Sequence, residues 1–358
     1  MEPSGSDLNN HSNTNNSLFD EDIVKAESSP STPSTAKSQK GSKPIIESRP
    51  ADQKPTINIV VIGHVDAGKS TLMGHILQNL GKVDQKQIHR NKKESSDMGK
   101  GSFSYAWVLD SSQEERARGI TMDVAMANFE SSKWNVTLLD APGHKDFIPN
   151  MISGAAQADA AILVVDAIPG AFETGLENQT KEHVLLVKSL GVSQLLVAIN
   201  KMDAVQWDQV RFNDIKARLI LFLRQAGFKV ESNVSFVPCS GFQDENLTEK
   251  PSSLALKTWY NGPTVIEAID SFALAERPDA KPLRFCVFDV FSSEIQKIAV
   301  AGKVEAGALS VGQRVAVMPT SQQCRIKSII KHGAPVKIAY SGDNVTMGLA
   351  DIEMNVLS

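Results

Sequence analysis

The 358-residue sequence predicts an α/β fold with a doubly wound, mostly parallel sheet, followed by a small β-barrel and preceded by a disordered tail. From Ile57 to Asp270, apolar runs of strand length alternate with segments of helix length, which is typical of a parallel sheet covered on both faces. Beyond Asp270, short β-rich runs are separated by Gly, Pro, Ser and Asp turns. We therefore predict a tail over 1–54, an α/β domain over 55–272, a linker over 273–280 and a barrel over 281–358.

The tail is rich in Ser, Asn, Thr, Pro and Lys and holds few apolar residues, so it cannot bury enough surface to offset its chain entropy. Within it, Ser17–Val24 combines acidic and apolar side chains, and Ser29 and Thr32 each precede a proline, as in many phosphorylation sites. Each of these stretches is either a functional motif or part of a solvated spacer.

The composition, with 41% hydrophobic and 22% charged residues, supports a soluble protein, and the lack of a signal or membrane-spanning run in the sequence predicts a cytoplasmic one. The net charge of -4 argues against RNA binding by bulk electrostatics, so any contact with RNA must be local or shared with a partner. Cys239, Cys286 and Cys324 are far apart and lack metal-ligand spacing, which indicates buried thiols in a reducing compartment and no zinc site. The sequence shows neither a secretory signal nor an apolar run of about 18 residues, the length that a membrane span needs.

Ten apolar or β-rich runs are expected to form strands. In the α/β domain, ligands should bind at the carboxyl ends of these strands. One interval, Lys82–Thr121, interrupts the alternation with charged and glycine-containing sequence and is either a mobile functional loop or a solvated surface. The expected strands are Ile57–Ile62, Val136–Leu139, Ala160–Val165, Leu195–Ile199 and Ser235–Pro238, and in the barrel Leu283–Val290, Lys297–Lys303, Arg314–Met318, Arg325–Ile330 and Val345–Leu349.

A glycine-rich loop follows the first strand and has the pattern G-x-x-x-x-G-K-S, in the strand-to-helix context that a phosphate loop requires. Its backbone N–H groups would surround phosphate oxygens at the N-terminus of the next helix. Lys69 would reach the β- and γ-phosphates, and Ser70 would bind Mg²⁺. Taken alone, the pattern also fits a glycine turn that binds nothing. The predicted nucleotide-binding residues of this loop are Gly63, His64, Val65, Asp66, Ala67, Gly68, Lys69, Ser70 and Thr71.

A second motif, D-A-P-G-H, begins at Asp140 directly after an apolar run. A carboxylate at the end of a strand can hold Mg²⁺ through water, and Gly143 can bring its N–H close to a γ-phosphate. His144 would orient the attacking water, although a histidine in a surface turn is the simpler interpretation of an isolated motif. In the long interval before it, the Thr121 hydroxyl would complete the Mg²⁺ coordination.

The third and fourth motifs predict the base pocket. Asn200-Lys201-Met202-Asp203 follows a buried strand, and the Asp203 carboxylate can accept both N–H donors of guanine, which adenine lacks. Asn200 would tie the base loop to the phosphate loop, and the stem of Lys201 would cover a face of the ring. After the next strand, backbone N–H groups of Cys239-Ser240-Gly241 would meet the guanine O6. Each motif alone fits an ordinary turn, but four motifs in this order make coincidence improbable.

With these motifs, the chain resembles a translational GTPase of the elongation factor one alpha type over nearly all of residues 57–358. Within that family it is most similar to the Pelota-partnered ribosome-rescue group, the heat-shock suppressor (HBS) type. Elongation factor one alpha normally lacks such a polar tail. Release factor three has the tail but typically reads Gly-Lys-Thr where this chain has Gly119-Ile120-Thr121. The stretches that carry the similarity are Ser104–Asp110, Gly143–Met151 and Ala161–Ala167.

The resemblance implies a monomeric GTPase that uses GTP and Mg²⁺ to deliver Pelota, a release-factor-like protein, to the 80S ribosome in no-go and non-stop decay, without a membrane. It implies Lys69, Gly143 and His144 as catalytic residues, with hydrolysis slow until ribosomal RNA positions the histidine. It also implies a hydrophobic gate at Val65 and Ile120, and a monovalent cation near Asp66.

The chain departs from the family in two places. It ends at Ser358, where the family continues into a second barrel that shares in Pelota binding, and Glu173–Gln179 is shorter and less glycine-rich than the matching family loop. Three alternatives to Pelota delivery therefore stay open: a non-catalytic or truncated binding module, delivery of aminoacyl-tRNA, and termination.

Overall fold

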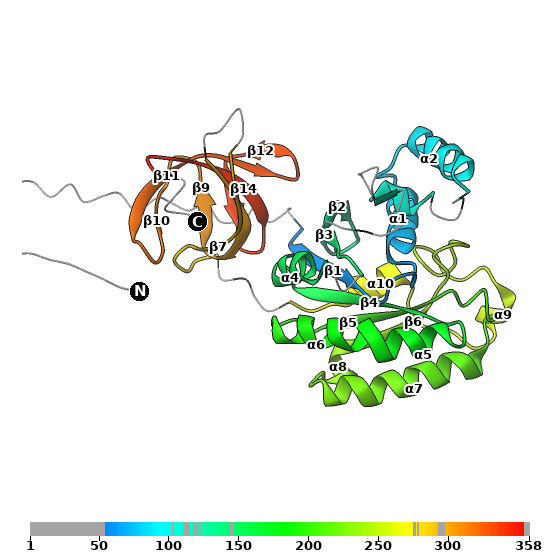
Figure 1. Cartoon of the computed structure of the whole chain (residues 1–358). Helices are drawn as coiled ribbons and strands as arrows, with labels where there is room; N and C mark the ends of the chain where they lie inside the picture. The colour runs from blue at the N-terminus through cyan, green and yellow to red at the C-terminus, as the bar shows by residue number, and fades with distance from the viewer. Residues whose placement is uncertain are drawn as a thin grey trace, which may run out of the picture. The chain divides into compact units, whose positions relative to one another are not determined.

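The computed structural model describes residues 54–99, 101, 104–109, 115–116, 121, 124–143, 147–274, 277, 279–292 and 298–353. The predicted tail lies outside the described residues, apart from Lys54. Within the described part, an α/β region precedes a region of antiparallel strands, in the order that the sequence predicts (Figure 1).

The α/β region contains a six-stranded sheet with the strand order β2-β3-β1-β4-β5-β6. All neighbours in this sheet are parallel except β2, which pairs with β3 in antiparallel fashion at one edge. The predicted doubly wound, mostly parallel sheet is therefore confirmed. The strands are β1 (Thr56–Ile62), β2 (Ala125–Glu130), β3 (Asn135–Asp140), β4 (Ala160–Asp166), β5 (Leu195–Asn200) and β6 (Val234–Pro238).

Residues of β1 point alternately to two separate hydrophobic cores, one on each face of the sheet. Val60 and Ile62 belong to one core, and Ile59 and Val61 belong to the other. Because helices cover both faces, every residue of β1 is buried, which explains a continuous apolar run instead of an alternating one. The first core is covered by α4 (Ile148–Ala156), α5 (Ala171–Gly175), α6 (Lys181–Ser189), α7 (Gln209–Gln225), α8 (Val230–Asn233) and α9 (Leu254–Lys257), and the second by α1 (Lys69–Asn79) and α10 (Val265–Asp270).

Two elements, α2 and β2, were not assigned from the sequence. Helix α2 (Gln85–Asp97) lies inside the interval that we expected to be irregular, so that expectation is wrong for these residues. The Asp84 side chain caps the helix by accepting a hydrogen bond from the Lys86 N–H, but the helix buries one apolar side chain, Ile88, and so lacks an apolar stripe. Strand β2 lies at the sheet edge and buries only Phe129, so its pattern is equally weak. The interval also contains a short 3₁₀ helix, η2 (Ala106–Val108).

The segment Glu173–Gln179, compared above with a family loop, is helical. Helix α5 continues into a π-helical turn, η4 (Leu176–Thr180), and then into α6. Within η4 the backbone of Asn178 leaves helical geometry, with φ -95° and ψ -105°. Because this connection is short, the chain continues from α5 to α6 in helical turns. The π turn accommodates one residue more than the α-helical repeat allows.

The C-terminal region forms the predicted small barrel of antiparallel strands. Its main sheet has the order β10-β11-β14-β8-β7, with β12 paired to β11, and β9 pairs with β13. The inward side chains form a core of their own that includes Val300, Leu309 and Ile326. The strands are β7 (Arg284–Phe291), β8 (Ala299–Ala306), β9 (Ala308–Ser310), β10 (Arg314–Val317), β11 (Gln322–Lys331), β12 (Ala334–Val336), β13 (Ile338–Tyr340) and β14 (Asn344–Ala350), of which the sequence reading missed the short β9, β12 and β13.

Candidate nucleotide-binding site

The sequence motifs follow strands that end at the same edge of the α/β sheet. The glycine-rich loop follows β1, the Asp140 motif ends β3, and the Asn200 and Cys239 motifs follow β5 and β6. Because these strands are parallel, their carboxyl ends lie together. The topology therefore gathers motifs that are up to about 180 residues apart in the sequence.

The glycine-rich loop has a conformation that depends on glycine at Gly68. Its φ is +88°, in the left-handed region, and a Cβ atom there would lie 2.5 Å from the Asn200 Nδ2. Helix α1 begins at the next residue, so the loop N–H groups and the N-terminal end of the helix dipole face the same space. An anion such as a phosphate group fits this arrangement.

The side chain of Lys69 folds back over the loop. It is 7% exposed, and its ammonium group donates hydrogen bonds to the carbonyl oxygens of Gly63 at 3.1 Å and His64 at 3.0 Å. Gly143 lies against it, since a Cβ at Gly143 would be 2.4 Å from the Lys69 Nζ. The structure thus brings together the three parts expected around a γ-phosphate, namely the loop, the lysine and the glycine that follows β3.

Three predicted metal ligands also meet. The hydroxyl oxygens of Ser70 and Thr121 are 3.2 Å apart. Asp140 is fully buried, and within the described part of the chain neither of its carboxylate oxygens has a hydrogen-bond partner. Burial raises the pKa of Asp140, and the nearby Ser70 hydroxyl and Lys69 ammonium partly offset that effect.

The donors around Asp140 are oxygens, which suit a hard cation such as Mg²⁺. An orphaned buried carboxylate beside two hydroxyls is the arrangement that such an ion would complete. The described residues contain no group of three or more His, Cys, Asp or Glu side chains placed to hold a metal. A magnesium ion here would therefore depend on the two hydroxyls, on water and on phosphate oxygens for most of its ligands.

The predicted catalytic histidine cannot be placed. His144 and the gate residue Ile120 lie outside the described residues, whereas Gly143 and Val65 lie within them. The Val65 N–H donates to the Gln179 Oε1 at 3.4 Å.

Asn200 connects the base loop to the phosphate loop. Its side-chain amide donates to the Ala67 carbonyl oxygen at 2.9 Å, and its Oδ1 accepts a hydrogen bond from the Gly241 N–H at 2.8 Å. Asp203 has a buried Oδ1 without a hydrogen-bond partner among the described residues. An unpaired buried carboxylate oxygen is costly unless a ligand supplies the donor, which points to a ligand with N–H groups at this position.

The other residues of the base pocket are held by the protein itself. The Lys201 ammonium donates to the Asp66 carbonyl oxygen at 2.6 Å and forms an ion pair with Asp166 at 2.7 Å, so its stem spans from the base loop to the phosphate loop. Ser240 is buried, and its hydroxyl accepts from the Gln243 N–H. Burial raises the pKa of Cys239, so the thiol stays neutral.

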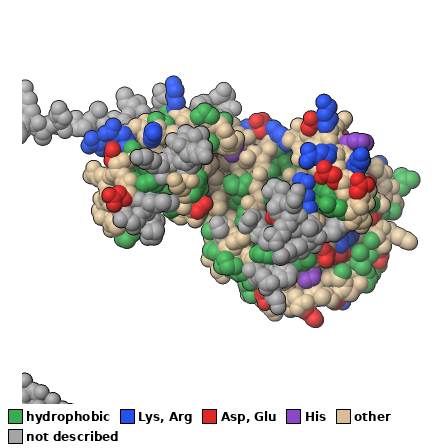
Figure 2. Space-filling model, turned by 45° about the horizontal axis from the view of Figure 1, so that its top comes forward, with side chains coloured by type: hydrophobic (Ala, Val, Ile, Leu, Met, Phe, Trp, Pro, Cys, Tyr) green, Lys and Arg blue, Asp and Glu red, His purple; other side chains and the backbone are tan. Residues whose placement is uncertain are grey.

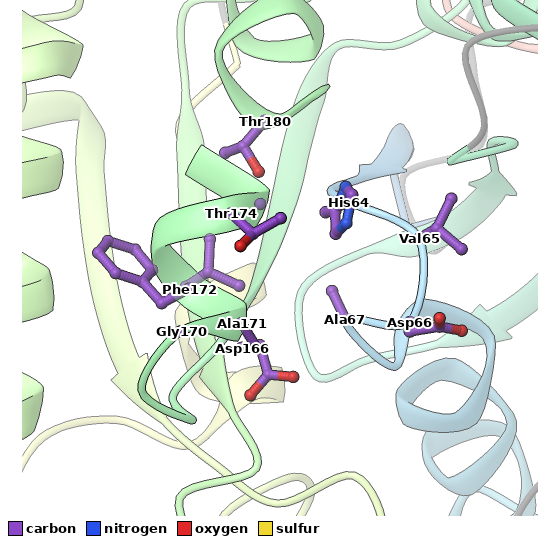
Figure 3. A pocket seen from close by; sticks show the side chains of 12 residues that line it. His64, Val65, Asp66, Ala67, Asp166, Gly170, Ala171, Phe172, Thr174 and Thr180 are labelled. Atoms are coloured by element: carbon purple, nitrogen blue, oxygen red, sulfur yellow. The ribbon is translucent and has the colours of Figure 1, made fainter. Parts of the chain in front are cut away.

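A cavity of about 310 Å³ lies between the phosphate loop and the α5–η4 segment (Figure 3). In Figure 3 the His64 side chain points from the phosphate loop toward Thr174 and Thr180. Asp66 and Asp166 also line this cavity.

Two residues that lie against the phosphate loop, Gln179 and His183, were not identified from the sequence. His183 of α6 is 2% exposed, and burial with the nearby Lys69 ammonium lowers its pKa to about 4, so the ring is neutral. Gln179 and His183 are four residues apart, a helical spacing that places both on the side facing the loop. That spacing is a signal in the sequence, but it has meaning only once η4 and α6 are known to be helical.

The α2 helix presents a local basic surface. Lys86, Arg90, Lys92 and Lys93 are all exposed there. Figure 2 shows a group of Lys and Arg side chains on the part of the α/β region where α2 lies. In a chain with net charge -4, this surface is a local concentration of positive charge. None of the described helices is both long and apolar enough to cross a lipid bilayer.

Comparison with known proteins gives matches over most of the chain. Residues 54–275 match the family model of the elongation factor Tu GTP binding domain, and residues 299–357 match elongation factor Tu domain 2. The chain is 48% identical to protein HBS1 of Drosophila melanogaster over 337 residues, which are 94% of this chain and 50% of that protein. It is 45% identical to elongation factor 1-alpha of Desulfurococcus mucosus over 307 residues, 85% of this chain and 69% of that one.

Among solved structures, the GTPase-like domain of S. cerevisiae Ski7 bound to GTP has the same fold. The TM-score is 0.67 at 21% identity, and the match covers 84% of this chain and 72% of that chain. The present chain thus spans about half the length of the HBS1 relative and about two thirds of the elongation factor.

Proposed function

Since this chain belongs to the translational GTPases of the elongation factor Tu and 1-alpha type, we propose that it binds GTP and GDP with Mg²⁺ and hydrolyses GTP. The observation that carries the proposal is a pair of carboxylates with buried oxygens that no described residue satisfies, namely both oxygens of the buried Asp140 and the Oδ1 of the partly exposed Asp203. One lies beside the phosphate loop and the other beside the base loop, and Asn200 connects the two loops. A guanine nucleotide with its metal would satisfy both.

In the proposed reaction, water attacks the γ-phosphorus in line with the bond to the leaving diphosphate. Lys69 would exchange its two carbonyl partners for β- and γ-phosphate oxygens and stabilise their developing charge. The Gly143 N–H would donate to a γ-phosphate oxygen, and His144 would orient the water. Magnesium, held by Ser70, Thr121 and water bound to Asp140, would supply further neutralisation of phosphate charge.

The likeness to HBS1 supports a role in ribosome surveillance, in which the chain delivers a Pelota-type protein to stalled 80S ribosomes in the cytoplasm. The basic surface of α2 supports a direct contact with ribosomal RNA. In this proposal the tail is 1–54, the GTP-binding domain 55–272, the linker 273–280 and the barrel 281–358, and the loops that carry Thr121 and Gly143 relax after hydrolysis and release the partner.

Nucleotide binding is tested by calorimetry of the full chain with GDP, GTP and ATP in the presence and absence of Mg²⁺. We expect guanine nucleotides to bind at least ~100-fold more tightly than ATP, because adenine leaves Asp203 unpaired. Equal affinities for the three nucleotides would overturn the proposed function.

Hydrolysis is tested by phosphate release with and without 80S ribosomes and Pelota. We expect slow turnover alone and a large stimulation with both, which His144→Ala removes while GTP still binds. Unchanged stimulation in that variant would remove the role assigned to His144. Binding without any turnover would instead indicate a non-catalytic binding module.

The partner is tested by pull-down with the full chain in the GTP-bound state. Recovery of Pelota supports the proposal. Because elongation factor 1-alpha relatives are about as similar as HBS1, aminoacyl-tRNA is offered as a competing partner, together with a release factor. Recovery of either in place of Pelota would assign the chain to elongation or termination.

A further inference from the structure

His75 lies on α1, where it touches both the Cys239–Gly241 loop that follows β6 and the turn that precedes η2. Its Nδ1–H donates to the Gly241 carbonyl oxygen at 2.5 Å, and its ring stacks on the Tyr105 ring with centroids 3.6 Å apart and planes at 25°. The side chain is 6% exposed, and burial lowers the pKa of His75, so the ring is neutral. The proton must lie on Nδ1, because a carbonyl oxygen only accepts hydrogen bonds.

One face of α1 packs against the Cys239–Gly241 loop. Leu72, His75 and Asn79 are spaced by three and four residues and therefore share that face. A Cβ at Gly241 would lie 3.0 Å from the Leu72 Cα, so the loop rests directly on the helix. Asn79 donates to the Asp244 Oδ1 at 2.6 Å.

The turn at Tyr105 also packs closely against α1. A Cβ at Gly74 would lie 2.1 Å from the Tyr105 carbonyl oxygen, so only glycine allows this approach. That oxygen accepts a hydrogen bond from the Val108 N–H and so begins η2. The Lys92 ammonium of α2 lies 5.1 Å from the centroid of the Tyr105 ring. The stack on His75 therefore fixes the end of the α2 to η2 segment against α1.

Both backbone polar groups of Gly241 are held. Its N–H donates to Asn200, which bonds to Ala67 of the phosphate loop, and its carbonyl oxygen accepts from His75. A continuous set of contacts therefore runs from the phosphate loop through the base loop to Tyr105. Four segments far apart in the sequence meet in it.

We propose that His75 is a positioning residue that couples the Cys239–Gly241 loop to the turn at Tyr105, so that bound guanine nucleotide and the packed turn stabilise each other. The inference rests on the proposed guanine-nucleotide binding. Coupling of this kind is reciprocal, because a contact that strengthens nucleotide binding must itself be strengthened by the nucleotide. The packing of the turn at Tyr105 then influences how long the nucleotide stays bound.

The coupling is tested first by the rate at which the full chain releases a fluorescent GDP analogue. We expect His75→Leu to release it ~10-fold faster, since both the hydrogen bond and the stack are lost. Tyr105→Leu should release the analogue ~5-fold faster than wild type. Tyr105→Phe keeps the ring, so its release rate should stay within ~2-fold of wild type. His89→Leu makes the same change at an exposed histidine of α2 and should leave the rate unchanged.

The double variant His75→Leu/Tyr105→Leu distinguishes coupling from general loosening. Because Tyr105 acts through His75, the double variant should be no faster than His75→Leu alone. Multiplied effects, near ~50-fold, would mean that the two residues act independently and would overturn the proposal.

Reciprocity is tested by hydrogen exchange of the Val108 and Leu109 amides, which donate to the carbonyl oxygens of Tyr105 and Ala106. In wild type GDP should slow their exchange ~5-fold, and in His75→Leu the response to GDP should be lost. A response preserved in that variant would contradict the coupling. If His75→Leu lacks a cooperative melting transition, Tyr105→Leu compared with Tyr105→Phe decides the same question.

The outcomes separate this inference from the proposed function. A wild-type chain that binds no guanine nucleotide would end both. A wild-type chain that binds GDP with the expected preference, with all variants releasing it at the wild-type rate, would end the coupling alone.

Discussion

The two ends of the nucleotide site are built differently. At the base end, Asn200, Lys201 and Gly241 are held by hydrogen bonds within the protein, and Asp203 retains one unsatisfied oxygen. At the phosphate end, Lys69 bonds to loop carbonyl oxygens, and Asp140 is buried with both oxygens unsatisfied. The base end is therefore nearly complete without a ligand, whereas the proposed nucleotide and magnesium would satisfy the unpaired oxygens of the phosphate end.

This difference suggests a division of work. A preorganised base pocket gives selectivity, because a wrong base leaves fixed polar groups unpaired. A phosphate pocket that the ligand completes can respond to the loss of one phosphate, because its own contacts change with the ligand. Lys69→Ala and Asp203→Asn test the two ends, Asn200→Ala tests their connection and His183→Gln tests a supporting contact, in order of decreasing expected effect.

Lys69→Ala tests the phosphate end and should have the largest effect. Removing a buried charged partner of phosphate costs about 3–5 kcal/mol, so GDP and GTP should bind ~200-fold or more weakly. The melting temperature of the nucleotide-free chain should change less than the nucleotide affinity, because the two carbonyl oxygens that accept hydrogen bonds from the ammonium are uncharged. Calorimetry and thermal melting measure the two quantities, and Lys257→Ala, at an exposed lysine of α9, serves as the lysine control. A large fall in melting temperature would show that the phosphate end is already complete without ligand.

Asp203→Asn tests the selectivity of the base end. Loss of the charged acceptor should weaken GDP binding by about 3 kcal/mol, roughly 100-fold, and should favour xanthine nucleotides, whose ring presents the complementary acceptor. Competition of XDP against GDP measures the change. Asp208→Asn, at the cap of α7, is a control outside the base pocket. If the Asp203 variant still preferred GDP, the base end would have to be assigned to other residues.

Asn200→Ala tests the connection between the two ends. The variant leaves the Ala67 carbonyl oxygen and the Gly241 N–H without their buried partner, at a cost of about 2 kcal/mol. We expect ~30-fold weaker GDP binding together with a lower melting temperature of the free chain. Weaker binding with an unchanged melting temperature would mean that Asn200 serves the ligand more than the preorganised loop.

The pH dependence of the free energy of unfolding tests the role of His183, which lies close to Lys69 at the phosphate end. Its folded pKa is about 4 and its unfolded pKa is about 6.5. Below pH 6.5 the unfolded chain binds a proton that the folded chain does not, so the free energy of unfolding falls as the pH decreases toward 4. Between pH 7 and pH 5 this loss should be about 2 kcal/mol.

The contribution of His183 is isolated by comparing denaturant unfolding of wild type and His183→Gln at several pH values. The variant should show the shallower dependence on pH over this range, whatever its overall stability. His89→Gln, at an exposed histidine, should follow wild type. Parallel curves for wild type and His183→Gln would contradict a buried neutral ring.

The sequence alone determined the fold class, the strands that carry the site and the order of its motifs. Strands β1, β4 and β5 are continuous apolar runs because both faces of the sheet are buried, and the glycine-rich loop has a fixed spacing because its backbone must follow phosphate groups. Such information is local, so it can be read along the chain.

Only the tertiary structure decided which side chains support the motifs. Strand β2 and helix α2 bury too little apolar surface to show a hydrophobic periodicity in the sequence. The connection between α5 and α6 is helical, although the matching segment of the family is a loop. His75 meets a carbonyl oxygen 166 residues away, and the role of His183 depends on the helix that places it under the phosphate loop. Contacts of this kind follow from packing between distant segments, because no feature within each segment specifies its neighbour.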